Sequence, residues 1–168
     1  MAEDIPILIA DDNADDLLLF ELAFRRAGFT NPILSVPDGD LVIDYLSEKP
    51  PFADRKKFPA PQLLILDLKM QRLGGLDVLT WVRNSPQWRC LPVIILTTSI
   101  FGLEIKQAYE RGANSFITKP NEFTDFVRSV KQMGDYWLRQ SQIPNPAAYP
   151  IISSQVAPDI QAPGGKGF

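Results

Sequence analysis

Five short apolar runs constrain the fold of this chain more than any other feature of its sequence. Each run is rich in Ile, Leu or Val without polar alternation, which is typical of strands covered on both faces of a parallel sheet. The runs are Ile5–Ala10, Ile33–Val36, Leu63–Leu66, Val93–Leu96 and Ser115–Ile117. Segments with helical spacing separate them. This alternation predicts an α/β doubly wound sheet of five parallel strands with five helices.

Apolar spacing and stop signals locate the helices. Helices are expected around 41–46, 78–82 and 105–109, the last ended by Gly112, and a fifth follows Asn121 as its N-cap. The first helix is marked by Leu18, Phe20, Leu22 and Phe24 and ended by Gly28. The stripe of the fifth helix comprises Phe123, Phe126, Val127, Val130, Met133 and Trp137.

Composition excludes several kinds of chemistry. The sequence has no His and one Cys, Cys90. It therefore has no Ser-His-Asp or Cys-His nucleophile and no HExxH zinc site. A single Cys forms no internal disulfide, which fits a reducing compartment. The net charge of −3 argues against a nucleic-acid-binding face.

The chain is expected to form one domain over residues 1–140, followed by a Pro/Gly-rich flexible tail over 141–168. The charged, Pro-punctuated segment Glu48–Pro61 is predicted to be a surface insert before the third strand. The acidic start lacks the features of a signal peptide. The apolar runs are far shorter than the roughly 18–20 residues that cross a bilayer. We therefore expect a cytoplasmic protein without a membrane partner.

Three carboxylates directly follow the first and third strands. In a doubly wound sheet, ligands bind beyond the C-terminal strand ends, where the strand order reverses. With the order 2-1-3-4-5, this point lies between strands one and three, at Asp11, Asp12 and Asp67. Like charges so close raise one another's pKa unless a cation compensates. Hard oxygen donors without His or Cys favour Mg²⁺.

These residues also have ordinary structural explanations. Asp11 or Asp12 could cap the first helix, and the pair alone does not decide between capping and function. Thr97 and Lys119, which end strands four and five, individually fit β propensity and a solvated surface charge. Together at one sheet edge, however, these side chains suit a phosphoryl group. Lys pairs with it, Thr hydrogen-bonds to it, and an Asp carboxylate such as Asp67 can form an acyl phosphate.

This ordered set of motifs resembles the receiver domains of response regulators, and the resemblance runs from about Ile5 to Arg139. Thr97 lies 30 residues after Asp67 and Lys119 lies 52 after it, spacings similar to those of chemotaxis-type receivers. The Pro-rich insert, and a fifth helix running into DYWL, are similar to small single-domain regulators of bacterial phytochrome-type histidine kinases. The resemblance implies a flavodoxin-like fold.

The resemblance also implies a function for each matching residue. Asp67 would accept a phosphoryl group from a phosphohistidine of a sensor histidine kinase. Mg²⁺ would be held by Asp12, Asp67 and the main-chain carbonyl of Lys69, with Asp11 in contact through water. Such a module would be no enzyme beyond weak Mg²⁺-dependent self-phosphotransfer and autodephosphorylation.

The implied switch involves three further residues. Lys119 would pair with the phosphoryl group, the Thr97 hydroxyl would move toward it, and Phe116 would swing inward behind it. Phe116 equally fits an ordinary core position on a buried strand. The switch would reshape the face made by the fourth helix, fifth strand and fifth helix.

Two residues depart from the family pattern. Gln71 stands where Pro usually follows the Met, while Gly75 keeps its place, so the turn is expected to survive with more freedom. Lys69 adds a second cation near the acceptor. It is either a solvated side chain or one that changes the lifetime of the acyl phosphate by occupying space near the attacking water.

Other functions fit this sequence less well. A haloacid-dehalogenase-like phosphatase has a second Asp two residues after its nucleophile, where this chain has Lys69. A nucleotide- or flavin-binding module would need a GxGxxG motif or a P-loop, and the sequence has neither. A degenerate receiver that binds partners without phosphorylation stays open because of Gln71.

The tail is too short for a helix-turn-helix output domain, so signalling would pass through contacts of the receiver itself, without direct nucleic-acid binding. Tyr136 and Trp137 close the fifth helix. Exposed aromatic side chains there would favour a homodimer through this helix.

Overall fold

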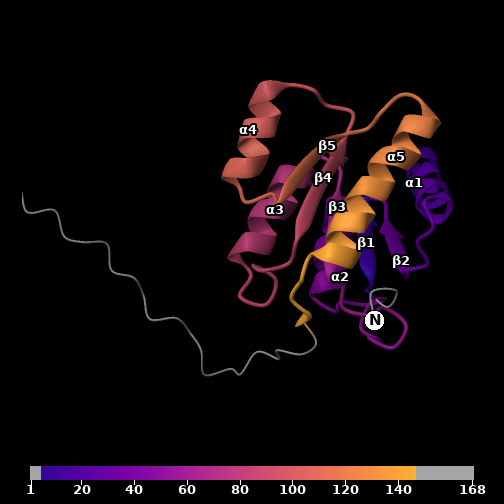
Figure 1. The fold of residues 1–168 in the computed structure, drawn as a ribbon. Helices are drawn as coiled ribbons and strands as arrows, with labels where there is room; N and C mark the ends of the chain where they lie inside the picture. The colour runs from indigo at the N-terminus through magenta and orange to yellow at the C-terminus, as the bar shows by residue number, and fades with distance from the viewer. Residues whose placement is uncertain (1–4, 147–168) are drawn as a thin grey trace, which may run out of the picture.

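The computed structural model describes residues 5–146 and contains a parallel sheet with helices on both faces (Figure 1). The sheet has five strands in the order β2-β1-β3-β4-β5, as predicted. The strands are β1 (Ile7–Ala10), β2 (Ile33–Val36), β3 (Leu63–Leu66), β4 (Val93–Thr97) and β5 (Ser115–Thr118). β1 begins two residues later than the apolar run suggests. The reason is that Pro6 has no N–H to donate to a neighbouring strand.

The helices form two layers. α2, α3 and α4 cover one face of the sheet, while α1 and α5 lie together on the other (Figure 1). The helices are α1 (Ala14–Arg26), α2 (Gly39–Leu46), α3 (Gly75–Asn84), α4 (Gly102–Glu110) and α5 (Phe123–Gly134), which continues into a π-helical segment at Asp135–Gln140. No helix within residues 5–146 has the length and apolar character to cross a membrane.

Neighbouring residues of the central strands enter different cores. Leu64 and Leu66 pack on the α2–α3–α4 side, whereas Leu63 and Ile65 pack on the α1–α5 side. All four side chains of β3 are fully buried. Covering both faces requires apolar residues at every position, which explains the continuous apolar runs in the sequence.

Helix ends follow local chemistry, with one correction. Gly28 and Gly112 have φ of 91° and 96°, so the predicted stops after α1 and α4 are confirmed. The predicted N-cap Asn121 is wrong, because α5 is capped at Glu122 and has no side-chain capping bond.

Two apolar stripes differ from the expected burial. Leu18 and Leu22 of α1 are 57% and 50% exposed, because the buried face of α1 is formed by Phe20, Ala23 and Phe24. Phe123 of α5 is also exposed, whereas Phe126, Val130 and Met133 are buried as predicted. Helical spacing places residues on a common face, but it does not say how wide the covered face is.

The Glu48–Pro61 insert is anchored to α2 by aromatic residues. The Tyr45 hydroxyl donates a hydrogen bond to the Pro59 carbonyl (2.8 Å). The ring centroids of Phe52 and Phe58 lie 5.1 and 6.1 Å from that of Tyr45. The insert is therefore packed against the α2–α3–α4 core. Most of the predicted C-terminal tail, residues 147–168, lies outside the described residues.

Candidate functional site

The acidic residues predicted from the sequence meet at the C-terminal edge of the sheet. Asp11 and Asp12 follow β1, and Asp67 follows β3. The backbone N–H of Asp67 donates to the Ala10 carbonyl (3.0 Å), which fixes the two strand ends side by side. Carboxylate oxygens of the three residues lie within 4.8 Å of one another. Asp11 and Asp67 are buried, while Asp12 is exposed.

Helix capping does not explain the acid pair. The N-cap of α1 is Asn13, whose side chain accepts hydrogen bonds from the N–H groups of Asp15 and Asp16. Asp11 accepts instead from the Asn13 N–H (2.9 Å), which orients its carboxylate beside the strand end. The alternative that Asp11 or Asp12 serves as the cap is therefore excluded.

Lys119 lies among these carboxylates. The backbone N–H of Lys119 donates to the Thr97 carbonyl (2.7 Å), which ties the end of β5 to that of β4. Its ammonium donates to Asp11 and to Asp16 (2.9 Å) and lies 3.6 Å from an Asp67 oxygen. The Lys119 side chain is only 10% exposed. The alternative explanation of Lys119 as a solvated surface charge is therefore excluded.

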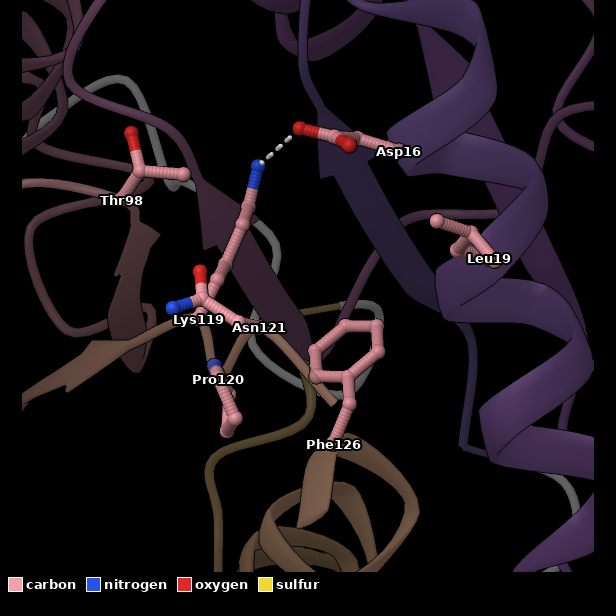
Figure 2. A pocket seen from close by; sticks show the side chains of 7 residues that line it. All are labelled: Asp16, Leu19, Thr98, Lys119, Pro120, Asn121 and Phe126. Atoms are coloured by element: carbon pink, nitrogen blue, oxygen red, sulfur yellow. Dashed lines mark hydrogen bonds and ion pairs between the residues drawn. The ribbon is translucent and has the colours of Figure 1, made fainter. Parts of the chain in front are cut away.

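Asp16 is the site residue that the sequence reading missed. It lies in the first turn of α1, and Figure 2 shows the Lys119 side chain extended toward it. The only sequence feature that pointed to Asp16 was its position four residues after Asp12. An acidic residue in a first helical turn is common, however, because it complements the helix dipole. Only the packing of α1 beside the end of β5 gives Asp16 a partner.

Burial and charge act in opposite directions on these groups. Burial raises the pKa of Asp11, although the hydrogen bond from Lys119 acts to lower it. Burial acts to lower the pKa of Lys119, but the carboxylates of Asp11, Asp16 and Asp67 outweigh it and raise that pKa above its ordinary value. Three carboxylates thus face one ammonium, and Asp12 adds a fourth negative charge to the cluster. This excess negative charge, presented by oxygen donors alone, fits a hard divalent cation.

Thr97 and Phe116 occupy the strands as predicted. Thr97 is fully buried at the end of β4, and its hydroxyl accepts a hydrogen bond from the Ser99 N–H (3.4 Å). Phe116 on β5 is partly buried against the α2–α3–α4 core. Its N–H donates to the Tyr109 hydroxyl of α4 (3.2 Å), so β5 and α4 are directly connected.

Lys69 is held by α4. Its ammonium lies 4.0 Å from a Glu104 oxygen and 5.5 Å from the centroid of the Phe101 ring. Its backbone N–H donates to Asp67 (3.4 Å). The side chain is 59% exposed but has Glu104 and Phe101 as partners, so it connects the loop after Asp67 to the start of α4.

The turn after Asp67 depends on glycine. A Cβ at Gly75 would lie 2.1 Å from the Asp67 carbonyl oxygen, and the Gly75 N–H donates to the Leu68 carbonyl (3.0 Å). The start of α3 therefore packs directly on the backbone of Asp67. Gln71, in place of the usual Pro, is accommodated in a turn where Arg72 has φ of 62°.

A small cavity adjoins the acidic cluster. It has a volume of about 200 Å³ and opens between α1 and the β5–α5 connection (Figure 2). Asp16 and Leu19 come from α1, and Phe126 comes from α5. The remaining lining residues are Thr98, Lys119, Pro120 and Asn121.

Known proteins share this sequence and architecture. A probable methanogenesis regulatory protein, FilR2 of Methanothrix harundinacea, is 35% identical over 87% of this chain and 92% of its own length. A response regulator in red light signalling of R. palustris, RPA3017, is 33% identical, with a TM-score of 0.80 over 84% of this chain and 99% of its own.

The phosphorylated cyanobacterial phytochrome response regulator RcpA is 27% identical, with a TM-score of 0.78 over the same 84% and 99% of the two chains. The predicted similarity to small phytochrome-associated regulators is therefore confirmed. Residues 7–131 match the response regulator receiver domain. With its acidic cluster at the end of a parallel 2-1-3-4-5 sheet, the chain belongs to the response regulator receiver domain family.

Proposed function

We propose that this chain is a single-domain response regulator that accepts a phosphoryl group on Asp67 from a phosphohistidine of a sensor histidine kinase. The observation that carries the proposal is the position of Asp67. Its carboxylate stands within an acidic cluster suited to a divalent cation, and the buried Lys119 ammonium lies 3.6 Å away.

The transfer requires one bond to form and one to break. A carboxylate oxygen of Asp67 attacks phosphorus, the P–N bond to the donor imidazole breaks, and the imidazole nitrogen keeps the bonding electron pair. Asp12, Asp67 and the Lys69 main-chain carbonyl would hold Mg²⁺, with Asp11 in contact through water. The positive charge of the ion would offset the negative charge of the phosphoryl oxygens. Lys119 places a second positive charge beside them.

The signal then passes to the α4–β5–α5 face. The Thr97 hydroxyl moves toward the phosphoryl group, and Phe116 turns inward behind it. Support for this route comes from the Phe116–Tyr109 hydrogen bond and from the Lys69 contacts with α4. Ile100, Phe101 and Leu103 at the start of α4 are 73%, 62% and 67% exposed, which gives this face apolar surface for a partner.

The partner kinase is proposed to be of the phytochrome type. RPA3017 and RcpA, whose names link them to red light signalling and to phytochrome, support this assignment. A homodimer through α5 stays a prediction. Tyr136 is 53% exposed, as a dimer contact requires, but Trp137 packs partly against the α1–α5 core.

The test is phosphorylation by acetyl phosphate with Mg²⁺, measured by intact mass. We expect the wild-type protein to gain the mass of one phosphoryl group and Asp67→Asn to gain none, because an amide is not a nucleophile here. Asp125→Asn, an exposed acidic residue of α5, serves as the control and should be modified like the wild type. Equal modification of wild type and Asp67→Asn would remove Asp67 as the acceptor.

A further inference from the structure

Of the carboxylates that contact Lys119 within residues 5–146, Asp16 alone is included neither in the receiver motifs nor in the predicted metal ligands. It reaches the site from the first turn of α1. Its side chain is 29% exposed and accepts a hydrogen bond from Lys119 at 2.9 Å. A buried lysine bound to a partly buried carboxylate is a defined contact, unlike a mobile surface ion pair.

Neighbouring Asp15 shows what an ordinary acidic residue does at this place. Asp15 and Asp16 lie in the same first turn, and both donate backbone N–H groups to the Asn13 side chain. Both complement the helix dipole. Asp15 is exposed, and Asp16 alone of the two contacts Lys119. The dipole therefore does not account for the position of the Asp16 side chain.

The Lys119 ammonium is shared between carboxylates of different function. Asp11 and Asp16 accept hydrogen bonds from it, while the nearest Asp67 oxygen lies beyond hydrogen-bond distance at 3.6 Å. Asp16 lines the adjoining cavity, and the Lys119 ammonium points toward the Asp16 carboxylate (Figure 2). If the Asp16 carboxylate were absent, the ammonium would have Asp11 and Asp67 as its remaining anionic partners.

We propose that Asp16 is a positioning residue, which holds the Lys119 ammonium beside Asp67 without letting it bind the nucleophilic carboxylate. This inference rests on the proposed function of Asp67. In the unphosphorylated protein, Asp16 keeps the Asp67 oxygens available to a divalent cation and to phosphorus. When the phosphoryl group arrives, its oxygens add negative charge next to an ammonium that already lies within a few ångströms.

The consequence of removing the Asp16 charge follows from competition. In Asp16→Asn, the ammonium pairs more closely with Asp67, so a divalent cation has to displace it. We expect about a fivefold weaker Mg²⁺ affinity and about a fivefold lower maximal rate of phosphorylation by phosphoramidate at saturating Mg²⁺. The donor concentration at half-maximal rate should change little, because Asp16 does not contact the donor.

The experiment is a double-mutant cycle between Asp16→Asn and Lys119→Met. Calorimetric Mg²⁺ titration and the phosphorylation rate are measured on the full chain. If Asp16 acts through Lys119, Asp16→Asn has a much smaller effect in the Lys119→Met background, which has no ammonium to misplace. The Mg²⁺ titration needs no phosphorylation, so it gives a result even where Lys119→Met reacts slowly.

Asp15→Asn is the matched control, because it removes one charge from the same helical turn without touching Lys119. We expect it to lower Mg²⁺ affinity less than twofold, the part due to long-range charge alone. Equal effects of Asp15→Asn and Asp16→Asn, or equal effects of Asp16→Asn with and without Lys119, would overturn the inference.

The two proposals fail in different ways. If the wild-type protein gains no phosphoryl group on Asp67, the proposed function fails, whatever the cycle shows. If the wild type is phosphorylated on Asp67 and the cycle shows no coupling, only the assignment of Asp16 fails.

Discussion

At the scale of single residues, parallel strands bring charged side chains that are far apart in the sequence to one edge of the sheet. Asp67 and Lys119 are far apart in sequence, yet β3 and β5 end at the same edge and leave their charged groups 3.6 Å apart. The strands supply the positions, and backbone hydrogen bonds such as that from the Lys119 N–H to the Thr97 carbonyl tie neighbouring strand ends together.

Lys69 gives a prediction at this scale. Its contacts with Glu104 and the Phe101 ring hold its side chain beside the start of α4. We propose that in this position it limits the space for a water that attacks phosphorylated Asp67. We expect Lys69→Ala to shorten the lifetime of phosphorylated Asp67 about two- to threefold, which corresponds to a weak single contact. The measurement is the loss of phosphoryl mass with time after removal of the donor.

Lys106→Ala is the control for this measurement, since Lys106 is an exposed lysine on α4 that pairs only with Glu110 among the described ion pairs. It should leave the lifetime unchanged. An unaltered decay rate in Lys69→Ala would show that Lys69 has no effect on the attacking water.

At the scale of elements, the insert before β3 is held by α2 through Tyr45. The phenol is buried, and burial raises the pKa of Tyr45 to about 12. Its hydroxyl donates the hydrogen bond to the Pro59 carbonyl. The insert therefore depends on the neutral phenol.

The alkaline stability of the protein tests this contact. Because the folded-state pKa is raised above the ordinary value of 10.0, the contribution of Tyr45 is fully present below pH 10 and is lost as pH rises toward about 12. Tyr45→Phe lacks the hydrogen bond, so we expect it to unfold about 1 kcal/mol more easily at pH 7. The difference between the two proteins should shrink between pH 10 and 12 in urea titrations. A difference that stays constant over this range would contradict the assigned hydrogen bond.

The positions of helices and strands along the chain could be predicted from the sequence much better than which side of each helix is buried. The runs and glycine stops located all five strands and the ends of α1 and α4. The spacing that located α1 does not predict that Leu18 and Leu22 are exposed, because which residues of α1 are covered depends on how it packs with α5. The N-cap of α5 was one residue off, because α5 is capped at Glu122 without a side-chain hydrogen bond, so no capping side chain marks its start.

At the scale of the whole molecule, the acidic cluster links the stability of the fold to the proposed binding of a cation. Folding brings Asp67 beside the adjacent pair Asp11 and Asp12, whereas in the unfolded chain Asp67 is far from that pair. A ligand that binds only the folded state stabilises it, by about 2.7 kcal/mol at a concentration 100 times its Kd. We therefore expect MgCl₂ to raise the unfolding temperature of the wild type.

The measurement is thermal unfolding followed by circular dichroism, with NaCl at equal ionic strength to separate specific binding from screening. Asp67→Asn should lose most of the Mg²⁺-dependent rise. An equal rise in NaCl, or an undiminished rise in Asp67→Asn, would argue against a cation at this cluster.

The sequence by itself determined the order and type of the elements, because apolar runs and glycine stops act locally. It also determined that Asp11, Asp12, Asp67, Thr97 and Lys119 end on one sheet edge, because parallel strands all point the same way. The tertiary structure alone decided that Asp16 shares the Lys119 ammonium and that α4 holds Lys69. Those contacts join segments whose separation depends on how helices pack on the sheet, and no local pattern encodes that distance.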